Sequence, residues 1–431
     1  MGQESRLPGE RPTLGANIQR VAHIPMKPRR VSKEPPHVAL IVETSMAYGR
    51  EILRGVSQYI RENGPWTVYL EHRSLQDPEP PWLRNWNGDG IISGAIPPSA
   101  SLAHAKSIPT VDLNDQGSLH GSNGKPSPRP SRRQPHIQSD HRAIGAWAAE
   151  HLLERGFSHF AFFGYPGFAW SRRILQGFTA AVREAGHFCY HYQDAQVVSW
   201  SHQLPAWEAE VDGASRWIAG LPKPLGLMAC NDFRGLQALD ACRRAGVAVP
   251  EEVAVIGADN EVLACELAYP PLSSVIPDCR RIGYEAAALL DGLMQGAPAP
   301  SSTLEIPPLG IATRQSTDVT AIADPSVAVA MTFIREHACE GIDVEDVLNH
   351  VLVSRSVLQK RFRATLHRTI HEVIAGERLR RVKQLLIETE LSLQGIAERS
   401  GFSHLEYLSA VFRKATGSTL AVYRKEHTRR R

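Results

Sequence analysis

Apolar residues along this chain follow two different periods, and each period predicts a different kind of element. The run HVALIVET at residues 37–44 is nearly continuous, as in a strand of a buried parallel sheet. The stretch after it places Ile52 and Val56 at helical spacing and reaches Gly64, where a helix cap is expected. Ordered structure therefore begins with a strand followed by a helix.

The same alternation recurs over most of the chain. Further strands are predicted at WTVYLEH, DGIISGAI, PTVDLN, HFAFFGYP, LGLMACND and VAVIGADN, and helices at RAIGAWAAEHLLERG, ILQGFTAAVREAG and RGLQALDACRRAG. Alternating strands and helices indicate an α/β fold with parallel sheets and helices on both faces. Ligands of such sheets bind outside the carboxyl ends of the strands. Residues 296–326 predict a last strand pair and then a linker.

The C-terminal part is different, because it repeats a helical pattern. VSRSVLQKRFRATLHRTIHEVI and GFSHLEYLSAVFRKATGSTLAVYRK each hold a leucine and a phenylalanine four residues apart, Leu358 with Phe362 and Leu408 with Phe412. A shorter helical pattern precedes each copy, and the long stretch HEVIAGERLRRVKQLLIETE joins them. The pattern predicts an all-α domain of two helix-turn-helix units.

In both units one helix face is apolar and the other is small, polar or cationic, which suits the major groove of DNA. In the second unit we expect Tyr407, Leu408, Val411 and Phe412 to be buried. Lys and Gln can bond base edges, whereas Arg363, Arg413 and Lys414 are expected to meet phosphates. The outward positions are Arg355, Ser356, Gln359, Lys360 and Arg363 in the first unit and Leu405, Glu406, Ser409, Ala410, Arg413 and Lys414 in the second.

The distribution of charge agrees with a DNA-binding end. Residues 1–36 carry a net +4, residues 37–324 carry −7 and residues 325–431 carry +6. A basic block attached to an acidic body is typical of a polyanion-binding module. The six cysteines form no CxxC pair, and the N-terminus has no apolar signal segment, so we expect reduced thiols, no metal and a cytoplasmic protein.

These observations divide the chain into four parts. We expect a disordered basic tail at 1–36, an α/β domain at 37–318, a linker at 319–326 and the helical domain at 327–431. Residues 116–136, rich in Gly, Pro, Ser and Arg, are expected to form a long surface loop.

The helical domain resembles the DNA-binding domain of the AraC/XylS transcription factors, through GIAERSGFSHLEYLSAVFRKATGSTLAVYR above all. The resemblance implies a double-stranded DNA operator as partner, with base contacts from Ser356, Gln359 and Lys360 and from Leu405, Glu406, Ser409 and Ala410. One departure is Leu352, which stands where the second unit has Gly401 at its turn. The first turn is therefore expected to be less tight.

The α/β domain resembles the effector domain of the LacI/GalR repressors in the order of its segments, from HVALIVETSMAYGREILRGV to ACNDFRGLQALDACRRAGVAVPEEVAVIGADNE. The resemblance implies two lobes that close on a small ligand, and it implies no cofactor. Together the two domains resemble the bacterial regulators of xylose catabolism. That combination implies an activator responding to a monosaccharide such as xylose, acting as a homodimer and in contact with RNA polymerase.

A sugar site needs carboxylates, amides and arginines for the hydroxyl groups and an aromatic ring for the apolar face. Relatives carry an arginine where this chain has Ile174, so a neighbouring arginine replaces it or the ligand lacks a polar group there. Candidate ligand-binding residues at strand ends and helix starts are Ser45, Tyr48, Asp140, Trp170, Arg172, Asp232 and Asp259.

Two other interpretations remain open from the sequence. The chain has no P-loop, GxSxG or HExxH motif, which disfavours an enzyme, and His187 and His191 share a strand face by spacing alone. A regulator that represses transcription, or that responds to a different small molecule, fits the same residues.

Overall fold

The computed structural model describes residues 34–428, apart from 75–76, 78–79, 95–107, 114–134, 193–203, 301, 319–323, 367 and 390. Residues 1–33 of the expected tail at 1–36 and most of the expected loop at 116–136 lie outside the described residues. The end of that loop is described, and there the prediction is wrong. His136 is buried and forms an isolated bridge with Asp112.

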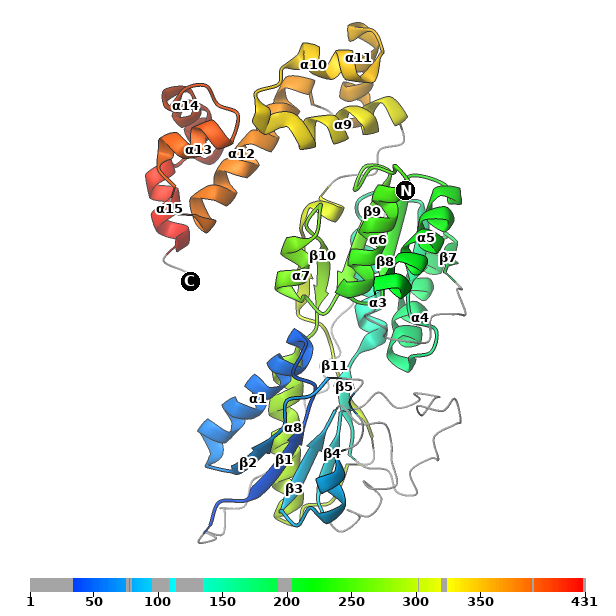
Figure 1. The fold of residues 1–431 in the computed structure, drawn as a ribbon, viewed down its shortest axis with the longest axis vertical. Coiled ribbons are helices and arrows are strands. Elements are labelled where there is room, and N and C mark those ends of the chain that lie inside the picture. The colour runs from blue at the N-terminus through cyan, green and yellow to red at the C-terminus, as the bar shows by residue number, and fades with distance from the viewer. Residues whose placement is uncertain are drawn as a thin grey trace, which may run out of the picture. The chain divides into compact units, whose positions relative to one another are not determined.

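The first lobe is built on a four-stranded parallel sheet of order β2-β1-β3-β4 (Figure 1). Two long helices, α1 and α8, lie side by side and bury one face of the sheet. The other face packs on the short helix η1 (Pro81–Asn85). The elements are β1 (His37–Ile41), α1 (Ala47–Asn63), β2 (Thr67–Leu70), β3 (Gly90–Ser93), β4 (Thr110–Asp112) and α8 (Cys279–Met294).

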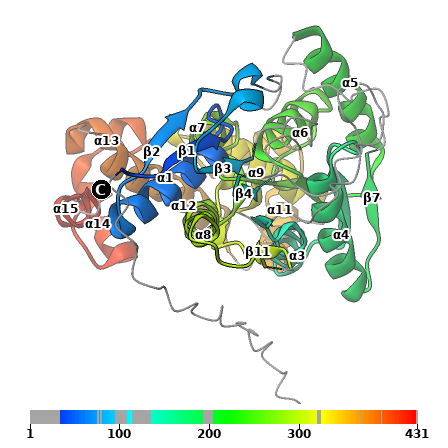
Figure 2. The ribbon, with the colours of Figure 1, turned by 90° about the horizontal axis from the view of Figure 1, so that it is seen from below.

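The second lobe has a six-stranded sheet of order β12-β10-β9-β8-β6-β7, parallel except between β10 and β12. Helices α3 and α4 cover one face, and α5 and α6 cover the other (Figure 2). The strands are β6 (His159–Phe163), β7 (Cys189–His191), β8 (Leu225–Ala229), β9 (Val253–Ala258), β10 (Ser273–Ile276) and β12 (Gly310–Ala312). The helices are α3 (His141–Leu153), α4 (Ala169–Glu184), α5 (Leu204–Gly220), α6 (Asp232–Arg244) and α7 (Val262–Leu267).

A small parallel sheet joins the lobes. Its strands are β5 (Ile137–Ser139) and β11 (Leu304–Ile306). The strand pair predicted within residues 296–326 is therefore wrong as a pair, because β11 bonds to β5 and β12 to β10. Sequence patterns missed β5 and β10, whose short runs IQS and SSVI contain as many polar as apolar residues or more, although their side chains are mostly buried.

The C-terminal domain is helical throughout its described residues. Helices α10 and α11 form the first helix-turn-helix unit, α13 and α14 form the second, and α12 joins them. Each unit has its own core. The elements are α9 (Pro325–His337), η3 (Ala338–Glu340), α10 (Val344–Val351), α11 (Arg355–Leu366), α12 (Ile370–Glu388), α13 (Leu393–Arg399), α14 (Leu405–Thr416) and α15 (Leu420–Thr428).

Other expectations can be compared with the structure directly. The domain begins at Pro325, two residues before the expected boundary, because Asp324 caps α9 through the Ser326 and Val327 amides. None of the six cysteines is in a disulfide, and all are buried except Cys339, which is half-buried. Among the described residues, no helix combines the length and the apolarity that crossing a bilayer requires.

Candidate functional site

Two predicted ligand-binding residues, Ser45 and Tyr48, lie where β1 leads into α1. Ser45 Oγ donates to the carboxylate of Glu43, which also accepts a 2.9 Å hydrogen bond from the Met46 amide. Tyr48 Oη lies 3.0 Å from Ser139 Oγ, at the end of β5. The first lobe therefore presents a carboxylate and two hydroxyls at the carboxyl ends of its strands. Glu43 is buried and was not predicted.

In the second lobe, Asp232 and Asp259 lie at the carboxyl ends of β8 and β9. Asp232 is 1% exposed, and its Oδ2 accepts a 2.7 Å hydrogen bond from the Glu261 amide. Its Oδ1 is buried without a hydrogen-bond partner in the described part of the chain. Asp259 and Asn260 have positive φ angles of 95° and 49°, which side chains other than glycine disfavour. Backbone strain after β9 and an unpaired acceptor after β8 thus lie close together, because the Glu261 amide bonds to Asp232.

Carboxylates from both lobes affect one another here. Burial, followed by the charges of Asp232, Glu261 and Glu43, raises the pKa of Asp259 well above its usual value. Burial also raises the pKa of Asp232 to about 7, against hydrogen bonds that lower it. It raises the pKa of Glu43 as well. Because burial is the largest cause in all three, these acceptors are poorly solvated and would gain by meeting hydrogen-bond donors.

Glu261 links the two lobes and was also missed by the sequence patterns. Its Oε2 accepts a 2.5 Å hydrogen bond from the Ala47 amide at the start of α1, and its Oε1 lies 3.1 Å from Arg50 Nη2. A carboxylate at a helix N-terminus is stabilised by the unpaired amides and the helix dipole. Glu261 therefore holds the two lobes together on the side of Asp232.

The remaining candidates lie at the starts of α3 and α4. Asp140 caps α3, accepting a 2.9 Å bond from the Ala143 amide, and its own amide bonds to the hinge strand β11. Trp170 is half-buried against Tyr165 and Phe168. Capping and packing are thus part of what these two residues do, and their role toward a ligand stays a prediction.

An arginine is expected three residues before Gly177, at the position that Ile174 occupies. Ile174 is buried in the core of the second lobe. Arg172 Nη1 donates a 2.8 Å bond to the Pro166 carbonyl in the loop before α4. A third arginine, Arg234, is buried, pairs with Glu210 and lies over the rings of Phe163 and Tyr165.

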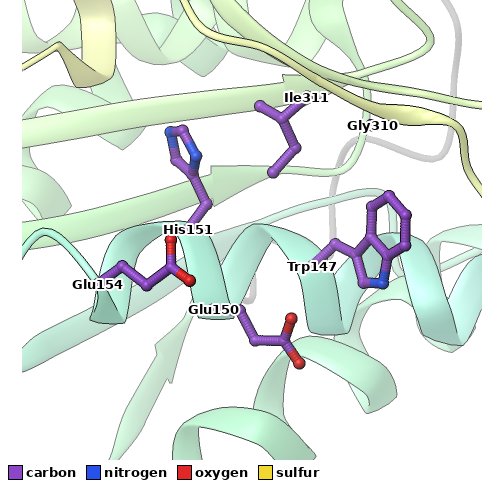
Figure 3. Close-up of a pocket in the computed structure, with 6 residues that line it drawn as sticks. All are labelled: Trp147, Glu150, His151, Glu154, Gly310 and Ile311. Atoms are coloured by element: carbon purple, nitrogen blue, oxygen red, sulfur yellow. The ribbon is translucent and has the colours of Figure 1, made fainter. Parts of the chain in front are cut away.

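A cavity of about 240 Å³ lies elsewhere in the second lobe, between α3 and β12 (Figure 3). The rings of Trp147 and His151 point toward Ile311, whereas the carboxylate of Glu150 points away. Burial lowers the pKa of His151 to about 4, and its Nε2 lies 2.8 Å from Thr317 Oγ1. None of the predicted ligand-binding residues lines this cavity.

The predicted DNA-facing residues lie on the exposed faces of α11 and α14. Leu358, Phe362, Leu408 and Phe412 are fully buried, which confirms the register of both repeats. The candidate residues on the exposed faces are Ser356, Gln359, Lys360, Arg363, Glu406, Ser409, Ala410, Arg413 and Lys414. Arg355 pairs with Glu345 at 2.7 Å, so α10 holds the side chain at the start of α11.

Two side chains of α14 differ from their predicted positions. Tyr407, expected in the core, is 53% exposed, and its ring centroid lies 6.1 Å from that of Phe402. Leu405, expected to face outward, is half-buried against the core of the second unit. The buried face of α14 is therefore rotated slightly from the one that positions 407, 408, 411 and 412 indicated, and part of the Leu405 side chain packs in the core.

Comparisons with known proteins agree with this architecture. A family model described as a periplasmic binding protein-like domain matches residues 149–317, and one described as a helix-turn-helix domain matches residues 348–426. The xylose operon regulatory protein of Escherichia coli K12 is 33% identical over 90% of this chain and 96% of its own length. That of Haemophilus influenzae is 33% identical over 88% and 95%.

A solved structure extends the match to three dimensions. The "xylose-binding transcription activator xylR" aligns with a TM-score of 0.75 and 31% identity, over 92% of this chain and 99% of that one. The match includes both the α/β domain and the helical domain. The chain therefore belongs to the family of xylose operon regulatory proteins, transcription regulators that join a periplasmic-binding-protein-like effector domain to a C-terminal pair of DNA-binding helix-turn-helix units.

Proposed function

We propose that the protein is a cytoplasmic activator of transcription that binds xylose between its lobes and operator DNA through α11 and α14. The observation that carries the proposal is a group of carboxylates, buried Glu43 and Asp232 and half-buried Asp259, at the carboxyl ends of strands from both lobes. Sugar hydroxyls donate hydrogen bonds to such acceptors. The similarity to a protein described as xylose-binding supports the same ligand.

The candidate residues take distinct roles in this scheme. Asp232 and Asp259 accept hydrogen bonds from ring hydroxyls, as do Ser45 and Tyr48 from the first lobe. The ring of Trp170 covers the apolar face of the sugar. Asp140 and Arg172 hold the loops that carry them and contribute further polar groups.

Lobe closure is the step that links sugar binding to DNA binding. Two protomers offer four recognition helices, and a change in lobe angle alters how a homodimer presents them to its operator. Promoter-bound protein then contacts RNA polymerase. Linkage requires sugar and DNA to change each other's affinity by the same factor, typically about 5-fold to 150-fold.

The pKa of Asp232 gives this site a pH dependence. Because the folded pKa is raised from 3.8 to about 7, the contribution of Asp232 to the stability of the unliganded fold is complete below 3.8 and is lost as the pH rises through 7. Ionised Asp232 is nonetheless the better acceptor. Xylose affinity is therefore expected to rise between pH 6 and pH 8, while the unliganded melting temperature falls.

A thermal-shift screen against pentoses and hexoses tests the proposal. A sugar at a hundred times its Kd stabilises a fold by about 2.7 kcal/mol, which is readily seen. We expect a shift with xylose that Asp232→Asn abolishes and that the matched variant Asp240→Asn, on the outer part of α6, leaves intact. The absence of a shift with every sugar would overturn the ligand assignment.

The same material decides between activator and repressor. Xylose that raises affinity for DNA supports activation, and xylose that releases DNA supports repression. Conversion of xylose by the purified protein, followed by chromatography of the sugar, would instead favour an enzyme.

A further inference from the structure

The helical domain and the second lobe are joined by a buried ion pair that none of the sequence patterns indicated. Arg335, near the end of α9, donates from Nη1 to Glu251 Oε2 at 2.9 Å and from Nη2 to Glu251 Oε1. Arg335 Nη1 also donates to the Val249 carbonyl at 2.9 Å. Thr332, one turn earlier in α9, lies 3.5 Å from the same carboxylate.

This pair is desolvated, unlike most ion pairs at domain surfaces. Glu251 is 0% exposed, and the side chain of Arg335 is 11% exposed. Burial lowers the pKa of Arg335, but the charge and hydrogen bonds of Glu251 more than offset it, so the pKa is raised overall. A two-pronged pair of this kind fixes orientation as well as distance. α9 is therefore held at a defined angle on the loop before β9.

β9 connects that loop directly to the proposed sugar site. Glu251 precedes the first residue of β9 by two positions, and Asp259 follows its last residue. Every residue of β9 is buried, and the strand is paired on both sides, with β8 and β10. A strand buried and paired in this way belongs to the tightly packed core, so the loop after β9 and Glu251 are parts of one packed unit.

The covalent connection between the domains is anchored on the same strand. In the short helix η2 (Gln315–Thr317), Ser316 Oγ donates to the Val255 carbonyl of β9 at 2.5 Å. Arg155 Nε donates to the Thr317 carbonyl at 2.7 Å, and Thr317 Oγ1 donates to Ser273 Oγ of β10 at 2.7 Å. The chain that enters the linker is thus fixed to the second lobe independently of the ion pair.

A second contact leads from the cleft to this anchor. Arg314, the residue before η2, donates from Nη2 to Asn260 Oδ1 at 2.8 Å and from Nη1 to the Leu272 carbonyl at 2.9 Å. Asn260 belongs to the left-handed loop beside Asp259. Both anchors of the helical domain therefore connect to the loop at which the proposed sugar site lies.

We propose that Arg335 and Glu251 form a clamp that makes the helical domain follow the second lobe as one body, so that lobe closure changes the orientation of the DNA-binding helices. The clamp positions the domain and contacts neither sugar nor DNA. It rests on the proposed function for the identity of the signal. Without the clamp, α9 loses this fixed attachment to the second lobe, and sugar binding no longer sets the orientation of α9.

The test uses the full-length protein with both charges removed, Glu251→Met with Arg335→Met, because a single change leaves one charge buried and unpaired and threatens folding. The matched control is Asp240→Asn with Arg243→Met, which removes an exposed pair from α6 of the same lobe. The DNA probe is a fragment selected from random sequence by the wild-type protein. Xylose affinity and DNA affinity with and without xylose are measured for each.

We expect the clamp variant to keep the wild-type Kd for xylose, and for DNA without sugar, within about twofold. The factor by which xylose changes the DNA Kd should fall from the typical range of about 5 to 150 toward 1. Backbone amides of α9 should exchange with solvent roughly tenfold faster, because α9 loses its anchor. The control variant should match the wild type in all three.

A wild-type coupling factor in the clamp variant, with both affinities intact, would overturn the proposal. The hydrogen-exchange readout separates this inference from the proposed function. If wild-type DNA affinity does not respond to any sugar, the proposed function fails, and the exchange rates of α9 decide the clamp alone: unchanged rates in the variant overturn it, and faster rates support it.

Discussion

The two helix-turn-helix units have the same left-handed backbone at their turns but different residues there. Both turns need a residue in the left-handed region, and the second unit uses Gly401 with φ of 72° whereas the first uses Leu352 with φ of 57°. Their surroundings differ. A Cβ on Gly401 would lie 2.7 Å from the Ala338 carbonyl oxygen, whereas the side chain of Leu352 is 87% exposed. Crowding therefore requires glycine in the second turn, whereas in the first turn only backbone strain disfavours the leucine that is present.

A second comparison shows how closely the units otherwise correspond. An arginine from the helix after each recognition helix donates to the carbonyl just before the first helix of the unit. Arg378 in α12 donates from Nη2 to the Ile342 carbonyl, and Arg424 in α15 donates from Nη2 to the Leu391 carbonyl, both at 2.7 Å. The repeated units are thus held closed by equivalent bonds, and they differ mainly at the turn.

Gly401→Leu should have the largest effect on this comparison. It combines a left-handed cost of about 1–2 kcal/mol with a steric cost of about 1–3 kcal/mol, so the second unit should lose roughly 2–5 kcal/mol of stability. Hydrogen exchange of α13 and α14 measures the loss. Gly417→Leu is the matched control, because Gly417 has φ of 73° but open space around its Cα. Equal losses at both glycines would show that crowding at Gly401 is unimportant.

Arg378→Met and Arg424→Met should come next. Arg424→Met removes a charged donor from one carbonyl, and Arg378→Met removes one from two, since Arg378 Nε also donates to the Ala338 carbonyl. Each change should cost at least about 1.5–3 kcal/mol, locally to its own unit. Exchange of the amides at the start of α10 should rise only in the first variant, and that of α13 only in the second. A response of both units to either change would contradict the picture of two separately closed units.

Lys360→Ala and Arg413→Ala compare the outer faces of the units. Both residues are exposed on recognition helices, and each should weaken DNA binding by roughly fivefold while leaving xylose binding unchanged. A phosphate contact would weaken all DNA sequences alike and reduce the slope of affinity against salt by about one. A loss confined to one base pair would instead assign the residue to base reading.

The two predicted sites differ in how far a local pattern can locate them. On α11 and α14 the predicted DNA-facing surface is the complement of a periodic apolar face, so Leu358 and Phe412 locate it. The proposed sugar site has no such period. Its carboxylates follow different strands, and what brings Glu43 near Asp259 is a sheet topology that a single local window does not contain.

Residues whose burial or position depends on distant parts of the chain were missed for a related reason. Glu251 looks like any surface glutamate in PEEVAV, and its burial depends on Arg335, which lies 84 positions away. Tyr407 stands next to Leu408 and its aromatic ring favours a core position. A helix presents only about one third of its surface to a neighbour, and Tyr407 lies outside that third. Short hinge strands such as β5 carry too few residues to show a period.

Leu352→Gly should have the smallest effect, and its sign is informative. Replacing a left-handed leucine by glycine should raise the free energy of unfolding by about 1–2 kcal/mol through relief of strain. The extra freedom of glycine in the unfolded chain should lower it by about 0.5–1 kcal/mol, so a net stabilisation of roughly 0.5 kcal/mol is expected. A thermal melt of the full chain measures it, with Leu352→Ala as the control that keeps the strain. Because the leucine side chain is exposed, its removal costs little packing. A clear destabilisation would mean that the left-handed φ of 57° costs Leu352 less than glycine loses through its freedom in the unfolded chain, and strain would then not be what separates the two turns.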